Sequence, residues 1–165
     1  MMNAARSRIG IIVRKDIGLG GVVVVSGLLF CFTPWAAAAE YSVQFGELRG
    51  ADHQTVLPTS NIKLCDKSTG YRFGYKIVPP GSGSYEYHAI IYLPAPAAQM
   101  ESKNSVISEG GKQIKTAAKN VIGPSVDEFG FDKGDPSGSW KIDVVVQNSV
   151  VATIKFDVAA AGSCP

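Results

Sequence analysis

The side chains best suited to metal or acid–base chemistry in this 165-residue sequence are two histidines and a short run of acids. A zinc site needs three or four ligands at suitable spacing. His53 follows Asp52 in a polar stretch, and His88 lies in a stretch of alternating residues. Their spacing does not bring the two histidines together. We interpret them as one surface histidine and one on a sheet face, and we predict no metal site and no cofactor.

The acidic run consists of Asp127, Glu128, Asp132 and Asp135. Hard oxygen ligands in a loop can hold calcium, but this spacing misses the EF-hand pattern and Lys133 lies inside the group. A solvated acidic loop is therefore the favoured interpretation, and calcium binding by the loop is the alternative.

No complete catalytic set can be identified in the sequence. A serine nucleophile needs a base and an oxyanion hole, and the sequence contains no Gly-x-Ser-x-Gly pattern. We predict that the protein is not an enzyme. A small hydrolase whose residues meet only in the fold is the alternative.

Four tyrosines form the most distinctive aromatic set: Tyr71, Tyr75, Tyr85 and Tyr87. If exposed on neighbouring strands, their rings would form a ligand face suited to sugars or peptides. Because Phe73 and Ile77 share the face of Tyr71 and Tyr75, the alternation favours an inward-facing core. The exposed face is kept as an alternative, and with it a carbohydrate-binding module.

Residues 1–39 resemble a secretory signal peptide. Arg6, Arg8, Arg14 and Lys15 precede an apolar run over residues 17–32, and alanines at 37–39 supply the small residues that signal peptidase requires. We predict cleavage between Ala39 and Glu40, which leaves residues 40–165 as a single domain in the periplasm or outside the cell. A retained membrane anchor is the alternative, although the run falls short of the roughly 20 residues that span a bilayer.

Cleavage changes the charge and the cysteine content. The formal net charge is +2 for the whole sequence. Because the predicted signal holds four of the 16 basic residues and only Asp16 of the acidic ones, the exported chain is close to neutral. This argues against nucleic acid or anionic lipid as a partner. Cys65 and Cys164 remain, and an oxidising compartment favours a structural disulfide between them over a redox pair.

Alternation of apolar and polar residues dominates the exported chain and predicts strands. The expected strands cover residues 41–48, 62–65, 71–77, 85–93, 126–132, 140–146 and 152–158. Residues 112–121 fit a strand or a helical turn, and we favour the strand. The last two strands, joined by a polar turn at residues 147–149, predict a hairpin. About seven strands separated by turns indicate an all-β, antiparallel, immunoglobulin-like β-sandwich preceded by a signal-peptide helix, with a closed barrel as the alternative.

Several short sequence motifs follow one another along the chain. They are Phe45-Gly46-Glu47-Leu48, the run 68–74 with Tyr71-Arg72-Phe73-Gly74, Phe129-Gly130-Phe131-Asp132, Gly138-Ser139-Trp140 and Phe156-Asp157-Val158. Together they resemble the bacterial family catalogued as domain of unknown function 3859. The resemblance covers nearly all of residues 40–165 and implies an exported β-sandwich, and that family carries no assigned activity.

These observations predict an exported, non-catalytic binding or accessory module. Its partner would be a protein or glycan of the cell envelope, and free edge strands would allow it to pair with another chain. After signal cleavage it would have no stable membrane anchor.

The cleavage site gives the first prediction. The intact mass of the protein isolated from its own cells should match a chain that begins at Glu40. A mass that includes residues 1–39 would instead support the retained anchor.

Overall fold

A computed structural model describes residues 40–97, 104–160 and 163–164. The predicted signal peptide, including Ala39 of the cleavage site, lies outside these residues. The described strands lie within one compact unit that spans residues 37–165. Among the described residues, no helix is both long and apolar enough to cross a membrane.

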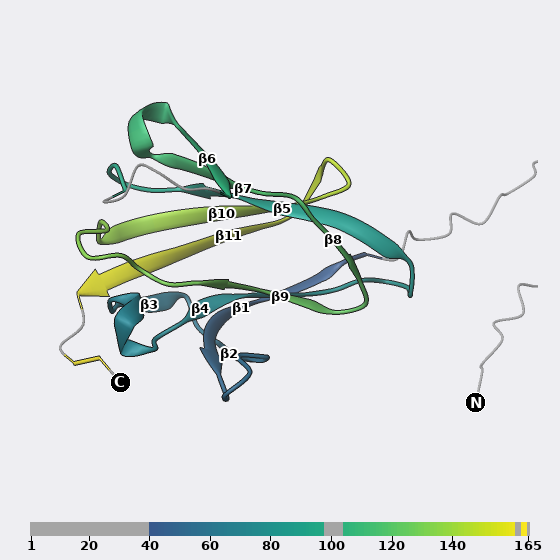
Figure 1. Ribbon diagram of the computed structural model, residues 1–165, viewed down its shortest axis with the longest axis horizontal. Coiled ribbons are helices and arrows are strands. Elements are labelled where there is room, and N and C mark those ends of the chain that lie inside the picture. The colour runs from purple at the N-terminus through teal and green to yellow at the C-terminus, as the bar shows by residue number, and fades with distance from the viewer. Residues whose placement is uncertain (1–39, 98–103, 161–162, 165) are drawn as a thin grey trace, which may run out of the picture. The chain divides into compact units, whose positions relative to one another are not determined.

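The strands form two sheets that lie as two layers (Figure 1). The four-stranded sheet has the order β2 (Thr55–Pro58), β1 (Ser42–Arg49), β4 (Phe73–Val78) and β9 (Ser125–Phe129). The seven-stranded sheet runs β3 (Asn61–Leu64), β11 (Ser149–Ala160), β10 (Gly138–Val146), β5 (Ser84–Tyr92), β7 (Gln113–Thr116) and β6 (Ser105–Ser108), and β8 (Lys119–Ile122) also pairs with β5. Short 3₁₀ helices, η1 (Lys67–Thr69) and η2 (Glu109–Gly111), lie in the connections.

The predicted all-β sandwich is confirmed, with two differences in detail. The described residues form eleven strands instead of about seven. The prediction missed β2 and β6, which are four-residue strands at sheet edges in polar or weakly patterned stretches. The region 112–121, for which we favour one strand, holds two: β7 and the greater part of β8. The pair β3–β11 is parallel, whereas the other pairs of named strands are antiparallel.

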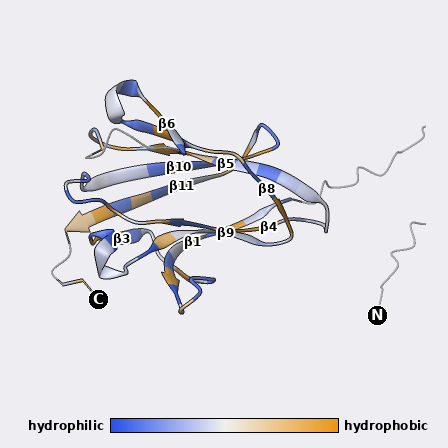
Figure 2. Cartoon of the chain, in the orientation of Figure 1, coloured by the Kyte–Doolittle hydropathy of each residue, from blue (hydrophilic) through white to orange (hydrophobic). Residues whose placement is uncertain are grey.

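The hairpin of β10 and β11 matches the prediction. The strands pair antiparallel around a turn in which Gln147 and Asn148 both have positive φ, of 48° and 65°. Such a turn matches the twist of the flanking strands. Hydropathy alternates along these strands (Figure 2), and Ile142 and Val144 on the apolar face of β10 are fully buried.

Aromatic rings join the two sheets. Phe45 of β1 lies 4.7 Å from Phe156 of β11 between ring centroids, and Phe73 of β4 lies 5.8 Å from the same ring. Phe131, just after β9, stacks on Phe73 at 4.7 Å and meets Trp140 of β10 edge-on at 5.5 Å. Such aromatic pairs contribute about 0.5–1.5 kcal/mol each beyond their burial.

The two glycines of the Phe-Gly marks allow strands to approach closely. Gly46 and Gly74 are register partners across β1 and β4. A Cβ atom on Gly46 would collide with the backbone of Leu57 in β2, and one on Gly74 would collide with the backbone of Asp127 in β9. Glycine at these positions therefore lets the four strands of this sheet pack side by side.

The four predicted tyrosines all belong to the core. Their exposed fractions are 4% for Tyr71, 0% for Tyr75, 2% for Tyr85 and 1% for Tyr87. The alternative of an exposed ligand face is therefore wrong, because the rings fill the space between the sheets and have no surface left to stack on a sugar. The inward-facing interpretation is correct.

Three of these tyrosines hold the segment that passes from one sheet to the other. The hydroxyl of Tyr85 donates to the carbonyl oxygen of Gly123 at 3.0 Å, and that of Tyr87 shares a 3.0 Å hydrogen bond with the hydroxyl of Ser125. The hydroxyl of Tyr75 donates to Oδ2 of Asp127 at 2.9 Å. The partners are alternate residues, Gly123 before β9 and then Ser125 and Asp127 within it, so we name these three bonds the tyrosine ladder.

The bond between Tyr75 and Asp127 is the most deeply buried rung. Asp127 is 3% exposed and also contacts the ammonium group of Lys119. Burial, together with the neighbouring carboxylate, raises the pKa of Tyr75, so its hydroxyl stays protonated and remains a donor.

The hydrogen bond between Tyr75 and Asp127 predicts how removal of the tyrosine hydroxyl changes the stability of the protein. Tyr75→Phe should lower the free energy of unfolding by about 1–3 kcal/mol, because it removes a donor from a buried carboxylate. Tyr85→Phe is the matched control, with a loss of about 0.5–1.5 kcal/mol, because its partner is a neutral carbonyl. Urea denaturation measures both. Equal stability of Tyr75→Phe and the parent would contradict this role.

Candidate binding cleft between the two sheets

Of the pockets formed by the described residues, one lies directly against the core side chains. This cleft has a volume of about 310 Å³. Its floor consists of core side chains: Phe73, Ile91, Leu93, Phe131, Trp140 and Ile142. Half-buried Phe129 forms one wall, and Ile107 and Ile114 form the opposite wall. A cavity of this size with an apolar lining falls at the lower end of the range for small-ligand sites.

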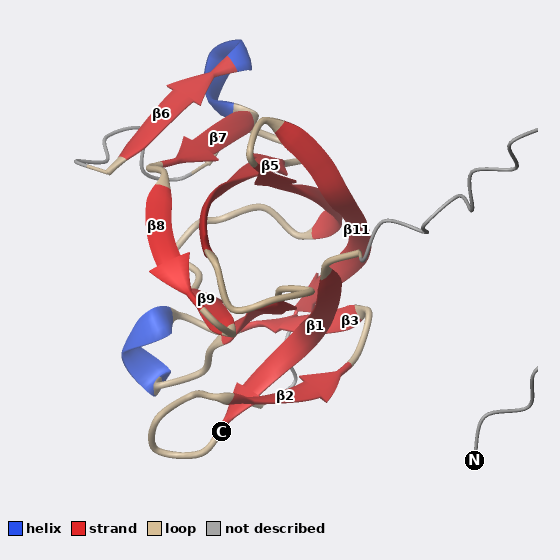
Figure 3. Cartoon of the chain, turned by 90° about the vertical axis from the view of Figure 1, so that its right-hand side faces the viewer, coloured by secondary structure: helices blue, strands red, loops and turns tan. Residues whose placement is uncertain are grey.

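The cleft exists because the two sheets differ in width. β9 is the last strand of the four-stranded sheet, whereas the seven-stranded sheet continues beyond β5 to β7 and β6. The end-on view shows β6 and β7 projecting beyond the ring of strands (Figure 3). The inward side chains of Ile107 and Ile114 therefore extend past the edge of the opposite sheet and face the cleft.

A polar rim borders the floor. Nζ of Lys67 lies 2.5 Å from Oδ1 of Asp132, and Oδ2 of Asp135 accepts a hydrogen bond from the backbone N–H of Asp132 at 2.8 Å. The hydrogen bond and charge of Asp132 raise the pKa of Lys67, so this rim residue remains a cation. On the opposite side, Ser105 and Thr116 complete the lining.

The rim is fixed by the short helix η1. The carboxylate of Asp66 accepts a hydrogen bond from the backbone N–H of Ser68 at 2.8 Å, which caps the helix. Hydrogen bonds from the side chain and then from the backbone of Ser68 lower the pKa of Asp66, so the cap stays ionised. The backbone N–H of Lys67 donates to the carbonyl of Phe131 at 2.8 Å, which ties η1 to the floor of the cleft.

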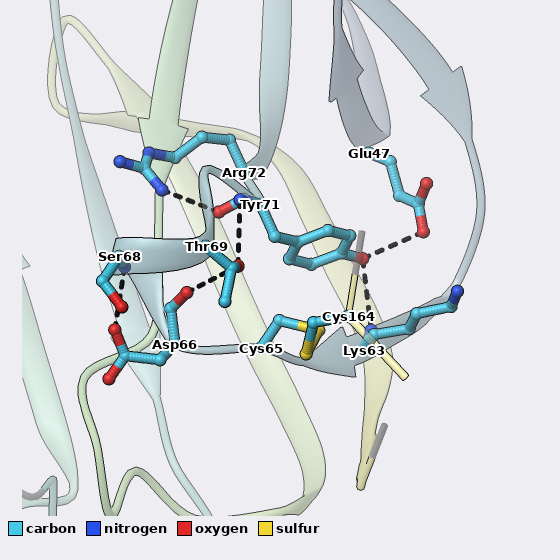
Figure 4. The surroundings of a disulfide bond; sticks show 9 residues. All are labelled: Glu47, Lys63, Cys65, Asp66, Ser68, Thr69, Tyr71, Arg72 and Cys164. Atoms are coloured by element: carbon cyan, nitrogen blue, oxygen red, sulfur yellow. Dashed lines mark hydrogen bonds between the residues drawn. A yellow bond between two sulfur atoms is a disulfide. The ribbon is translucent and has the colours of Figure 1, made fainter. Parts of the chain in front are cut away.

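A disulfide lies directly before η1. Cys65 and Cys164 are joined with their Cα atoms 5.7 Å apart, and Cys65 is fully buried. Beside the disulfide, the hydroxyl of Tyr71 donates to Oε1 of Glu47 at 2.9 Å and accepts from the backbone N–H of Lys63 at 3.2 Å (Figure 4). Burial raises the pKa of Tyr71 to about 12. The structure thus brings the two predicted cysteines together and uses them to hold the C-terminal end against the base of the rim.

The polar residues singled out in the sequence do not form a catalytic group in the cleft lining. Nδ1 of His53 lies 2.8 Å from Glu128, whose other oxygen accepts from Nε of Arg72 at 2.8 Å. Partial burial alone would raise the pKa of Glu128, but the hydrogen bonds from His53 and Arg72 lower it. His88 lies on the outer face of β5, where burial and the charge of Lys115 lower its pKa.

The acidic run does not converge on one point. Asp127 points into the core toward Tyr75, whereas Glu128 lies on the opposite face of β9. Asp132 pairs with Lys67. Within the described ranges, no group of three or more side chains is arranged to hold a metal ion. The calcium alternative therefore lacks a ligand set here, and the interpretation as a solvated loop is wrong for Asp127, which is a buried structural acid.

Sequence reasoning missed the two isoleucines of the cleft wall. Ile107 lies in a stretch whose apolar pattern is too short to identify a strand, since β6 has four residues. Ile114 lies in the region 112–121, for which a strand is predicted, but no local pattern shows that it faces a cleft. The inward direction of Asp127 could have been predicted from the sequence. Asp127 lies two residues before Phe129, and residues two apart on a strand share one face.

Comparison with known proteins identifies a fold. The family model described as PM0630 beta sandwich domain matches residues 43–159. A search of curated proteins gives no significant match.

Solved structures give weak likenesses. An immunoglobulin-like protein from Pseudomonas aeruginosa is 16% identical, with 74% of this chain and 100% of that chain covered and a TM-score of 0.46. A Pseudomonas fluorescens alkylpurine DNA glycosylase bound to DNA containing an abasic site analog is 12% identical, covers 74% of this chain and 31% of its own, and has a TM-score of 0.35. A Listeria innocua β-glucosidase in complex with isofagomine is 10% identical over 73% of this chain and 16% of its own, with a TM-score of 0.37. Nothing about function follows from likenesses at this level.

The disulfide provides a prediction at this site. Replacing both Cys65 and Cys164 with serine should lower the free energy of unfolding by about 4–5 kcal/mol, because the bond closes a loop with a sequence separation of 99. Urea denaturation with and without reductant measures the effect, and the parent protein in reductant should behave like the double variant. An unfolding midpoint that reductant leaves unchanged would contradict this role.

Proposed function

Because this chain belongs to the PM0630 beta sandwich domain family, whose description names a fold and no activity, we propose that it is an exported, non-catalytic binding module. Residues 1–39 direct it to the periplasm or the cell exterior and are removed between Ala39 and Glu40. The basic start and apolar run of that segment support export. A disulfide that closes most of the domain suits an oxidising compartment.

The cleft between the sheets is the binding site of this module. Its about 310 Å³ of apolar-walled space is the observation that carries the proposal. Burying an apolar group there removes both that group and the exposed parts of Phe129, Ile107 and Ile114 from water, which is favourable at about 25 cal/mol per Å². The charged side chains of the rim favour contact with water at the entrance of the cleft.

Other functions have less support. A carbohydrate-binding module would need the four tyrosine rings at the surface, and they are buried. A hydrolase would need a histidine and an acid beside a cleft. His53 and Glu128 are paired on the surface, but neither is among the residues that line the cleft, and Arg72 shares the carboxylate. The glycan partner is therefore less favoured than a partner that offers apolar groups.

The finer family placement is also a proposal. The marks from Phe45 to Val158 support membership in the domain of unknown function 3859 family. That placement agrees with the matched β-sandwich model but goes further than it.

Trp140 provides a direct test of the cleft. The sequence has two tryptophans, and removal of residues 1–39 takes away Trp35, so Trp140, in the floor of the cleft, is the only tryptophan of the exported chain. Titration of the exported chain with the apolar dye anilinonaphthalene sulfonate should quench its fluorescence by energy transfer in a saturable manner.

Two substitutions on the same strand make the test specific. Ile107→Asp places a charge in the cleft wall and should weaken dye binding by about tenfold or more, a cost of about 1.4 kcal/mol. Val106→Asp is the matched control, because Val106 is 66% exposed on the other face of β6. Equal dye affinity in the two variants would rule out the cleft as the site.

A further inference from the structure

The cleft lies where the four-stranded sheet lacks a strand. Across the sandwich, rings of β1 and β4 pack on β11, and the outer positions are β9 in one layer and β7 and β6 in the other. A strand placed beside β9 would lie opposite β7 and β6. It would cover the inward side chains of Ile107 and Ile114, which no strand of the four-stranded sheet faces.

The edge of β9 supplies the chemistry that recognises a strand. β9 pairs with β4 on one side only, and no further described strand continues the sheet beyond it. An edge strand presents N–H and C=O groups at alternate residues to a pairing chain. The free edge ends after Phe129, because the carbonyl of Phe131 already accepts from the N–H of Lys67. Within Ser125–Phe129, only the alternate residues whose N–H and C=O groups point away from β4 thus remain available for pairing.

We infer that the cleft accepts an extended segment of a partner protein, which adds to the edge of β9 as a strand and inserts apolar side chains at every second residue between Phe129 and Ile107. This inference rests on the proposed function of the cleft and names its occupant. In this mode of recognition the main chain contributes affinity, and the pocket for alternate side chains contributes specificity.

Charges around the cleft limit the sequence of that segment. The rim carries both signs, with Lys67 next to Asp132 and with Asp135 bonded to the backbone of Asp132. The outward carboxylate of Glu128 is already engaged by Arg72 and His53. A segment with uncharged apolar residues inward and neutral polar residues outward therefore fits better than a charged one. A small apolar molecule could fill the floor but would leave the edge of β9 unpaired.

The test uses a designed peptide of alternating valine and threonine, with blocked ends and a fluorescent label, and the exported chain, residues 40–165. Along a strand, all residues whose side chains point one way also direct their N–H groups to the same edge. N-methylation of every valine therefore blocks one edge of the peptide, and N-methylation of every threonine blocks the other. The two methylated peptides have the same composition and serve as controls for each other.

Fluorescence anisotropy should show that the parent peptide binds and that one methylated form binds with similar affinity. The other form should lose on the order of tenfold or more, because several hydrogen bonds to β9 disappear together. Ile107→Asp should weaken the parent peptide, and Val106→Asp should not.

Three results would overturn the inference, and they differ from failure of the proposed function. Equal binding of both methylated forms would show that the main chain is not recognised. Dye binding without peptide binding would leave the apolar cleft as a site but refute the strand partner. A homodimer that the peptide cannot dissociate, seen by sedimentation equilibrium, would assign the edge of β9 to a second copy of the chain. Absence of dye binding as well would refute the proposed function itself.

Discussion

A tyrosine ring that enters a protein core brings a hydroxyl group that must find a hydrogen-bond partner there. In this sandwich the partners of Tyr75, Tyr85 and Tyr87 are provided by the chain as it passes from β8 to β9. An unpaired buried hydroxyl costs about 1–3 kcal/mol, so the three bonds together constrain where this segment can lie. They place β9 at the edge of the four-stranded sheet and orient Asp127 inward.

The position of β9 determines the rest of the candidate site. Since β8 pairs with β5 and β9 pairs with β4, the chain closes the sandwich along this part of its side. The cleft lies at the Phe129 end of β9, where Ile107 of β6 and Ile114 of β7 also belong to its lining. On the far side of the floor, the disulfide at Cys65 and the capped helix η1 fix Lys67 at the rim. Core side chains, the disulfide and the capped helix thus fix the floor and one rim of the cleft, and such preorganisation reduces the entropic cost of binding.

The sequence was sufficient for those parts of the fold in which local alternation and burial agree. The hairpin of β10 and β11 is an example, because Ile142 and Val144 mark one face and Gln147 and Asn148 tolerate the positive φ of its turn. The inward direction of the tyrosines followed from the same periodicity. These features depend on neighbours in the chain and could therefore be predicted without a partner strand.

The cleft and the tyrosine ladder could not be predicted in that way, because they depend on strand order. Tyr75 and Asp127 are 52 residues apart, and no local pattern shows that they meet. Ile107 appears unremarkable until β6 is seen to extend past the opposite sheet. The parallel pairing of β3 with β11 is likewise a long-range contact.

Amide hydrogen exchange of the native protein distinguishes an open edge at β9 from a covered one. If β9 is a fixed but open edge, protection should alternate along Ser125–Phe129, with amides that face β4 strongly protected and amides that face away from it exchanging rapidly. Uniform strong protection of these residues would mean that the edge is already covered.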